Sequence, residues 1–199
     1  MEAENQTTLD SGNETLVLRV GYDGTSYAGF AQQEKQPHVK TVAGELRQAL
    51  RTVLRRDVEL TCAGRTDAGV HARAQYVSLP FGAEEFEQRT SQRLLRSLGA
   101  VLPPDIRVYE LYRAPSGFSA RFDARARRYR YHLCSGPVGP LFCANWSWWI
   151  RTAQPHALDA NAMNEAAHCL IGEHDFKSFC KASSAVGKPT CRYVESCRV

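Results

Sequence analysis

The sequence has 199 residues, of which 43% are hydrophobic and 23% are charged, a balance typical of one large globular domain or two small ones. No window approaches the ~18 apolar residues of a membrane-spanning helix, so the composition excludes a membrane-embedded chain. The 25 basic residues outnumber the 21 acidic ones, and the resulting net charge of +4 is compatible with a polyanionic partner.

Residues 1–14 are expected to form a short disordered acidic tail, because they hold four acidic residues and no basic ones. They lack the basic head and the apolar core of a signal peptide. Setting these four aside leaves 17 acidic residues against 25 basic ones, a charge of about +8 for the rest of the chain. The folded part is therefore expected to be moderately basic.

The seven cysteines indicate reduced thiols and not a disulfide framework or a zinc site. Their number is odd, and they show neither a CxxC pair nor a Cys/His ligand spacing. Several, such as Cys62 and Cys169, lie in apolar stretches, where a free thiol behaves as a small hydrophobic group. We therefore expect no metal site and a cytoplasmic location.

The first predicted elements are a strand, a loop and a helix. Residues 15–23 alternate apolar and polar side chains and end at an Asp-Gly turn pair. Residues 25–40 carry Gly, Gln, Pro and His without a period and indicate a surface loop. From Thr41, which is suited to cap a helix, apolar residues recur at helical spacing, and arginines follow where the helix dipole favours them.

Four further elements complete the first half. Residues 58–64 and 74–81 are predicted strands, 85–102 is a predicted amphipathic helix ended by a Pro-Pro pair, and 106–114 is a predicted strand. The order β-α-β-β-α-β indicates an α+β, ferredoxin-like fold with helices on one face of an antiparallel sheet.

The rest of the chain predicts a shorter version of the same order. Tyr129, Tyr131 and Leu133 alternate on a predicted strand. Residues 159–172 form a predicted helix capped by its first residue, an aspartate, and residues 192–199 begin another strand. The WSWW run is expected to pack in a core or an interface.

We therefore divide the chain into a tail at 1–14, an N-terminal ferredoxin-like half at 15–115 and an incomplete second half at 116–199. No linker separates the two halves. Their antiparallel sheets are expected to join into one extended sheet, with the helices on one face.

The stretch LTCAGRTDAGVHARAQ holds the main candidate for chemistry. In an extended segment, side chains two apart point the same way, so Arg65 would lie beside Asp67 and hold its carboxylate ionised. Alternatively, Asp67 opens a turn over Ala68 and Gly69, and Arg65 is a surface cation. These residues alone leave both interpretations open.

A second aspartate, Asp23, follows the first strand in YDGTSYAGF. The fragment DGT is similar to the motif of haloacid-dehalogenase phosphatases, whose nucleophilic aspartate stands two residues before it. Gly21 occupies that position here, so the phosphohydrolase hypothesis fails on that residue. A turn at Asp23 and Gly24 is the expected structure.

The segment RFDARARRYRY places five arginines within ten residues, interleaved with aromatic residues. Arginine contacts phosphates and aromatic rings stack on bases, so this composition is typical of an RNA-binding surface. A solvated basic edge strand with a buried aromatic face is the alternative. The arginines are Arg121, Arg125, Arg127, Arg128 and Arg130.

Taken together, YDGTSYAGF, AGRTDAGVHARAQ, FSARFDARARRYRYHL and LIGEHDFKSF resemble, in order and spacing, the motifs of the tRNA pseudouridine synthase A family (TruA). The resemblance runs from about Leu16 to the last residue, and GRTDAGVHA is its most specific part. It implies a pseudouridine synthase fold and a cofactor-free isomerase that detaches uracil from its ribose and reattaches it through carbon five.

The resemblance also implies roles for individual residues. Asp67 matches the catalytic carboxylate, Arg65 the arginine that pairs with it and helps to hold the flipped nucleotide, and Tyr129 the residue that packs on the uracil. The arginines named above and further motif positions are expected to bind the substrate: Tyr22, Asp23, Gln33 and His71. The implied substrates are uridines 38, 39 and 40 of the tRNA anticodon arm, and the implied assembly is a homodimer.

The sequence departs from the family pattern in three places. Ala31 stands where the family usually has glutamine, and Ser119 replaces a histidine. The family's third motif, of the form FLxxMVR, is missing from this sequence. We therefore expect a fragment or truncated product with weak or no activity, and a truncated RNA-binding module is the alternative to a working synthase.

Overall fold

The computed structural model describes residues 13–32, 38–155, 157–180, 187 and 189–199, and it divides the chain into two units. The first unit ends at Tyr129, and the second is Arg130–Val199. The expected halves met at residues 115 and 116. The segment after 115 belongs to the first unit because Ala120 donates its backbone N–H to Ser78 Oγ, over 3.0 Å.

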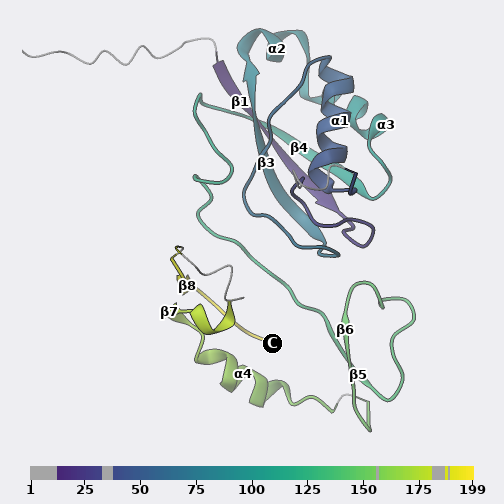
Figure 1. The fold of residues 1–199 in the computed structure, drawn as a ribbon, viewed down its shortest axis with the longest axis vertical. Helices are drawn as coiled ribbons and strands as arrows, with labels where there is room; N and C mark the ends of the chain where they lie inside the picture. The colour runs from purple at the N-terminus through teal and green to yellow at the C-terminus, as the bar shows by residue number, and fades with distance from the viewer. Residues whose placement is uncertain (1–12, 33–37, 156, 181–186, 188) are drawn as a thin grey trace, which may run out of the picture. The chain divides into compact units, whose positions relative to one another are not determined.

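The first unit is a mixed α+β structure around one antiparallel sheet, as the sequence predicted (Figure 1). Its four strands stand in the order β2-β3-β1-β4. A short helix, α2, is added to the expected order of elements. The elements are β1 (Asn13–Tyr22), α1 (Val42–Leu54), β2 (Thr61–Cys62), β3 (Ala72–Gly82), α2 (Ala83–Gln88), α3 (Ser91–Val101) and β4 (Ile106–Ala114).

Helices α1 and α3 lie side by side on one face of this sheet (Figure 1). Helix α1 starts where the sequence predicted, because Thr41 Oγ1 accepts the Gly44 N–H over 3.2 Å. The core lies between the helices and the sheet, where alternate residues of β1 meet the apolar side of each helix. Its members include Leu16, Leu18, Val20, Leu46, Leu50, Leu94 and Leu98.

The opposite face of the sheet carries tyrosines. Arg19 pairs with Tyr76 across β1 and β3, so both point away from the core side that Leu18 occupies. The rings of Tyr76 and Tyr112 are 6.4 Å apart, and both are exposed. This face therefore presents polar and aromatic groups, and the helix-covered face is apolar.

Two predicted elements of the first unit differ in extent. The helix expected over 85–102 is two helices, because Thr90 takes an extended conformation and caps α3 by accepting the Arg93 N–H over 3.3 Å. The strand expected over 58–64 is reduced to the two residues of β2, which pair with Ser78 and Val77 of β3.

The second unit contains short elements and little core. Its elements are β5 (Leu133–Gly136), β6 (Trp148–Arg151), α4 (Ala160–His168), β7 (Gly172–Asp175), the 3₁₀ turn Lys177–Phe179 and β8 (Cys191–Val194). The predicted cap of α4 is confirmed, since Asp159 Oδ1 accepts the N–H groups of Asn161 and Ala162. Among its described residues, Ala167 is the one buried hydrophobic side chain.

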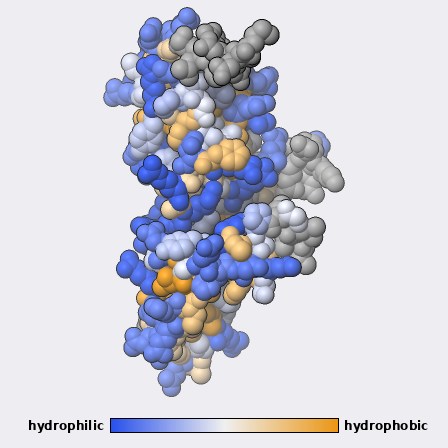
Figure 2. All heavy atoms as spheres, turned by 90° about the vertical axis from the view of Figure 1, so that its left-hand side faces the viewer, coloured by the Kyte–Doolittle hydropathy of each residue, from blue (hydrophilic) through white to orange (hydrophobic). Residues whose placement is uncertain are grey.

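Two expectations for this unit were wrong. The described strands form three separate sheets and not one extended sheet, and β5 and β6 are parallel. Tyr129 and Tyr131 precede the first strand, because pairing with β6 begins only at Leu133. The tryptophans were expected in a core or an interface. Trp148 is 59% exposed and so lies outside a core, and packing in an interface stays a prediction. Figure 2 shows apolar side chains scattered over a largely hydrophilic surface.

Among the described residues, no helix is long and apolar enough to cross a bilayer.

Candidate active site

The loop between β2 and β3, residues 63–71, carries Arg65 and Asp67 and is closed at its base by hydrogen bonds. Ala63 donates its N–H to the Tyr76 carbonyl over 2.9 Å. The buried amide of Gln75 bridges Gly64: its Oε1 accepts the Gly64 N–H over 3.4 Å, and its Nε2 donates to the Gly64 carbonyl. The two ends of the loop are therefore fixed to β3.

Asp67 opens a turn at the tip of this loop, so the turn interpretation of the sequence is confirmed. The Val70 N–H donates to the Asp67 carbonyl over 3.2 Å, and Gly69 has φ 76°. A positive φ at the third residue of such a turn favours glycine. The turn does not exclude chemistry, because it leaves the Asp67 side chain exposed to solvent.

The loop after β1, residues 22–30, packs directly on the Asp67 loop. The Phe30 N–H donates to the Thr66 carbonyl over 2.9 Å, and the Gly69 N–H donates to the Tyr27 carbonyl over 3.2 Å. The hydroxyls of Tyr22 and Thr66, one residue from Asp67, are 2.8 Å apart. Backbone and side-chain bonds together thus hold the residues on each side of Asp67.

Two glycines allow this close approach of the loops. A Cβ on Gly24 would lie 2.0 Å from the Val70 carbonyl oxygen, which is far inside van der Waals contact. A Cβ on Gly29, whose φ is 107°, would lie 2.8 Å from the Thr66 carbonyl oxygen. The first motif of the sequence, YDGTSYAGF, therefore supplies a surface on which the second motif rests.

The side chains of Asp23 and His71 also meet where the two loops join. His71 Nδ1 lies 3.1 Å from Asp23 Oδ1, and it accepts the Gly24 N–H over 3.2 Å. The pKa of Asp23 is lowered from its ordinary value, first by the hydrogen bonds that it accepts from Thr25 and further by His71. Both predicted site residues thus bind the protein's own loops.

Two buried tyrosines in this region keep their protons well above neutral pH. Burial raises the pKa of Tyr22, which is 5% exposed. Burial and the hydrogen bond to Asp105, with a Tyr27 OH to Oδ1 distance of 2.6 Å, raise the pKa of Tyr27. Each hydroxyl can therefore act as a neutral donor that fixes the loop after β1.

The structure does not form the expected Arg65–Asp67 pair. Both side chains are exposed, and within the described ranges no ion pair includes either of them. Strand β2 ends at Cys62, so residues 65–67 do not belong to a strand, on whose regular alternation the expected alignment depended. Tyr129 is 78% exposed, and no described hydrogen bond or ring contact joins it to Asp67.

The arginine segment touches the base of the Asp67 loop through one of its members. Arg127 Nε donates to the Ala63 carbonyl over 3.0 Å, and its terminal nitrogen donates to the same oxygen. Arg121 stacks over the Phe122 ring at 5.3 Å. The side chains of Arg125, Arg128 and Arg130 are exposed, and Gln33 lies outside the described residues.

Thr66 and Gln75 are site residues that the sequence interpretation missed. Both stand inside the motif AGRTDAGVHARAQ, so their position was a signal. Their function depends on partners elsewhere in the chain: Tyr22 is 44 positions from Thr66, and Gly64 is 11 positions from Gln75. Among the described residues, no group of acidic, histidine or cysteine side chains could hold a metal ion.

The fold and the site define an α+β protein with an exposed carboxylate, Asp67, on a loop that packs against the loop after β1. A family model described as tRNA pseudouridine synthase matches residues 19–123, and the chain belongs to this family. The resemblance inferred from the motifs is therefore confirmed.

Curated relatives support this assignment. A protein of Streptomyces avermitilis named tRNA pseudouridine synthase A is 46% identical over 178 residues, covering 87% of this chain and 60% of the relative. Proteins of the same name from Streptomyces griseus and Corynebacterium glutamicum are each 43% identical, over 95% and 84% of this chain and 64% and 58% of theirs. The chain thus spans about three fifths of the length of these relatives.

Proposed function

We propose that the Asp67 loop is the catalytic loop of a tRNA uridine isomerase. In this reaction the bond between uracil N1 and ribose C1′ breaks, and a bond between uracil C5 and C1′ forms. C5 loses a proton and N1 gains one, so the reaction needs no oxidant, reductant or cofactor. The observation that carries the proposal is the exposed carboxylate of Asp67 on a turn that the loop after β1 holds in place.

Each site residue has a proposed role. Asp67 attacks the sugar or the base, or takes a proton from the sugar, and each of these needs a charged carboxylate. Arg65 pairs with this carboxylate when the nucleotide is flipped out, and Tyr129 packs on the uracil ring. Arg127 secures the base of the loop while neighbouring arginines contact phosphates.

The finer features of the function rest on the family resemblance. We propose uridines 38, 39 and 40 of the anticodon arm as targets, a homodimer as the working assembly and the cytoplasm as the location. The element order of the first unit and its strand order β2-β3-β1-β4 support a ferredoxin-like arrangement for that half.

Tritium release tests the proposal directly, because the reaction removes the hydrogen on C5. A tRNA transcript carrying uridine labelled with tritium at C5 is incubated with the chain, with Asp67→Ala and with Asp67→Asn. Asp57→Asn is the matched control, since Asp57 is an exposed aspartate on a different segment, paired with Arg51 at 3.4 Å. We expect release from the wild type and the control and none from either Asp67 variant.

Each other outcome has a defined meaning. Release that persists in Asp67→Ala would refute the assigned catalytic residue. No release from any protein, with salt-dependent RNA binding intact, would identify an RNA-binding module. Transcripts with cytidine at position 38, 39 or 40 then test the targets, because release must fall when a true target is replaced.

A further inference from the structure

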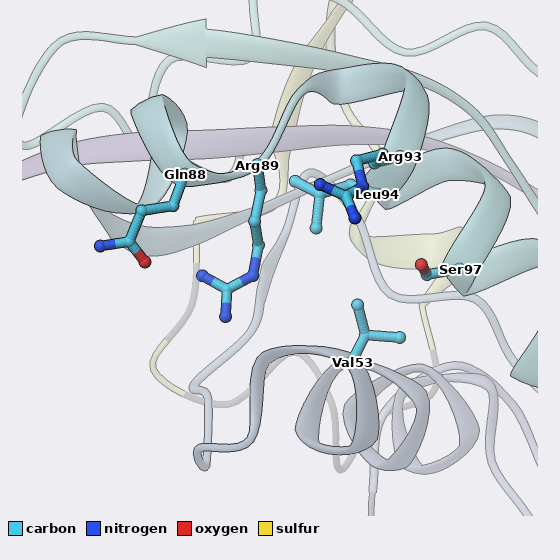
Figure 3. A pocket seen from close by; sticks show the side chains of 6 residues that line it. All are labelled: Val53, Gln88, Arg89, Arg93, Leu94 and Ser97. Carbon is cyan, nitrogen blue, oxygen red and sulfur yellow. The ribbon is translucent and has the colours of Figure 1, made fainter.

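A pocket of about 320 Å³ lies on the helical side of the first unit, between α1 and the α2–α3 pair (Figure 3). None of its residues belongs to the Asp67 loop or to the loop after β1. Two apolar side chains, four hydrogen-bond donors and no carboxylate form its lining: Val53, Leu94, Gln88, Arg89, Arg93 and Ser97.

The break between α2 and α3 directs these donors to one place. Arg89 follows α2 in an extended conformation, and Thr90 starts the next helix. Arg93 and Ser97 lie four residues apart on α3 and therefore share one side of the helix. Figure 3 shows both guanidinium groups extending into the space between α3 and Val53 of α1.

The two arginines of this pocket form no ion pair with any acidic residue that the structure describes. From Gln88 to Pro104 the sequence holds three arginines and no acidic residue. The first turn of α3 also lacks an acidic residue and contains Arg93, the opposite of what the helix dipole favours. No ion pair of the described residues engages Arg89 or Arg93.

Glu85 interacts electrostatically with Arg89, but its carboxylate is bound more closely by other groups. Arg56 binds both Glu85 oxygens, with Nε to Oε1 at 3.0 Å and Nη2 to Oε2 at 2.9 Å. Glu85 Oε2 also accepts the Gly82 N–H over 3.0 Å. Arg89 therefore makes no ion pair with Glu85 at contact distance, and its guanidinium can bind an external anion.

We propose that this pocket binds a phosphate group of the RNA backbone. Arginine forks match the geometry of phosphate oxygens, and the amide and hydroxyl of the lining add uncharged donors. The choice of RNA over a free phosphate ion rests on the proposed function, which makes a polyanion the substrate. The pocket gives the first unit a second RNA contact, separate from the Asp67 loop.

Salt-dependent binding of an anticodon-arm hairpin tests this proposal. The full chain is compared with Arg89→Gln, Arg93→Gln and the control Arg96→Gln, an exposed arginine of α3 that does not line the pocket. Losing one phosphate contact makes the slope of log affinity against log salt shallower by about 0.7 to 0.9. At about 0.1 M salt this corresponds to an affinity that is about five- to eightfold weaker. We expect this loss in both pocket variants and not in the control.

If all three variants lose the same RNA affinity, a diffuse basic surface binds the RNA and the proposed phosphate site is refuted. Unchanged salt slopes in the two pocket variants would also refute it. A parallel titration with inorganic phosphate at constant ionic strength distinguishes the source of the anion. Phosphate binding that needs Arg89 and Arg93, with RNA binding unaffected, would overturn the RNA assignment. If the wild-type chain binds RNA but releases no tritium, the proposed catalysis is refuted and the test of the pocket remains valid. If the wild-type chain binds no RNA, both the proposed function and the proposed pocket are refuted.

Discussion

Removing the Tyr22 hydroxyl is predicted to loosen the Asp67 loop without changing its exposed surface, because Tyr22 is buried. Tyr22 is 5% exposed, and its hydroxyl lies 2.8 Å from Thr66 Oγ1. A hydrogen bond of this kind contributes about 1 kcal/mol to the free energy of unfolding. With a urea dependence of about 1–3 kcal/mol/M, Tyr22→Phe should lower the midpoint of unfolding by roughly 0.3–1 M.

A double-mutant cycle assigns this loss to the pair of hydroxyls. Tyr22→Phe, Thr66→Val and the double variant are unfolded in urea and followed by far-UV circular dichroism, because all three tryptophans lie in the second unit. We expect a coupling energy of about 1 kcal/mol. Additive effects of the two substitutions would contradict a direct interaction. Tyr76→Phe, on the exposed face of the sheet, is the control and should leave the midpoint almost unchanged.

The same variants separate positioning from RNA contact. If Tyr22 positions the loop, Tyr22→Phe lowers the rate of tritium release and leaves the affinity for the anticodon-arm hairpin unchanged. The opposite result, weaker RNA binding with unchanged stability, would show that Tyr22 contacts the RNA itself and would refute this reasoning.

Two further substitutions probe the contact between the loops. Gly24→Ala places a methyl group 2.0 Å from the Val70 carbonyl oxygen and should lower the free energy of unfolding by about 1–3 kcal/mol. Gly99→Ala is the contrasting substitution, because a methyl group there, on α3, would meet no atom within 4 Å beyond the helix's own backbone. It should raise the free energy of unfolding by about 0.5–1 kcal/mol. Urea midpoints check both, and equal stability of Gly24→Ala and wild type would contradict the packing. Hydrogen bonds from Thr25 are the main reason that the pKa of Asp23 in the folded protein lies below its ordinary value of 3.8. The Asp23 carboxylate therefore adds to the free energy of unfolding above pH 3.8, and this stabilisation is lost as the pH falls through the folded pKa. Between about pH 5 and about pH 3, wild type should therefore lose more stability than Asp23→Asn, and parallel losses would disprove a role for this carboxylate.

The sequence predicted elements whose limits depend on local signals. The strand at 106–114 was predicted with the bounds that β4 has, since turn-forming prolines precede it and its side chains alternate. The start of α1 followed from Thr41. The helix at 85–102 was predicted as continuous because its apolar residues keep helical spacing on both sides of Thr90. This spacing does not reveal that Thr90 caps a second helix.

The site was predictable to the same extent. The motif around Asp67 indicated a loop with a turn, and the turn is present. The expected pairing with Arg65 assumed a strand through residues 65–67, but β2 ends at Cys62. The bond between Tyr22 and Thr66 could not be inferred, because residues 44 positions apart meet only through the pairing of β1 with β3.

The contact between residues 22–30 and 63–71 has a consequence for grafting the Asp67 loop into other scaffolds. Thr66, Gly69 and Val70 of the Asp67 loop lie against main-chain atoms of the loop after β1. That loop can come so close because it has glycine at positions 24 and 29. A graft of residues 63–71 alone would carry the carboxylate but leave behind the template that sets its conformation. The smallest portable unit is the pair of loops with the two strands, β1 and β3, that bring them together.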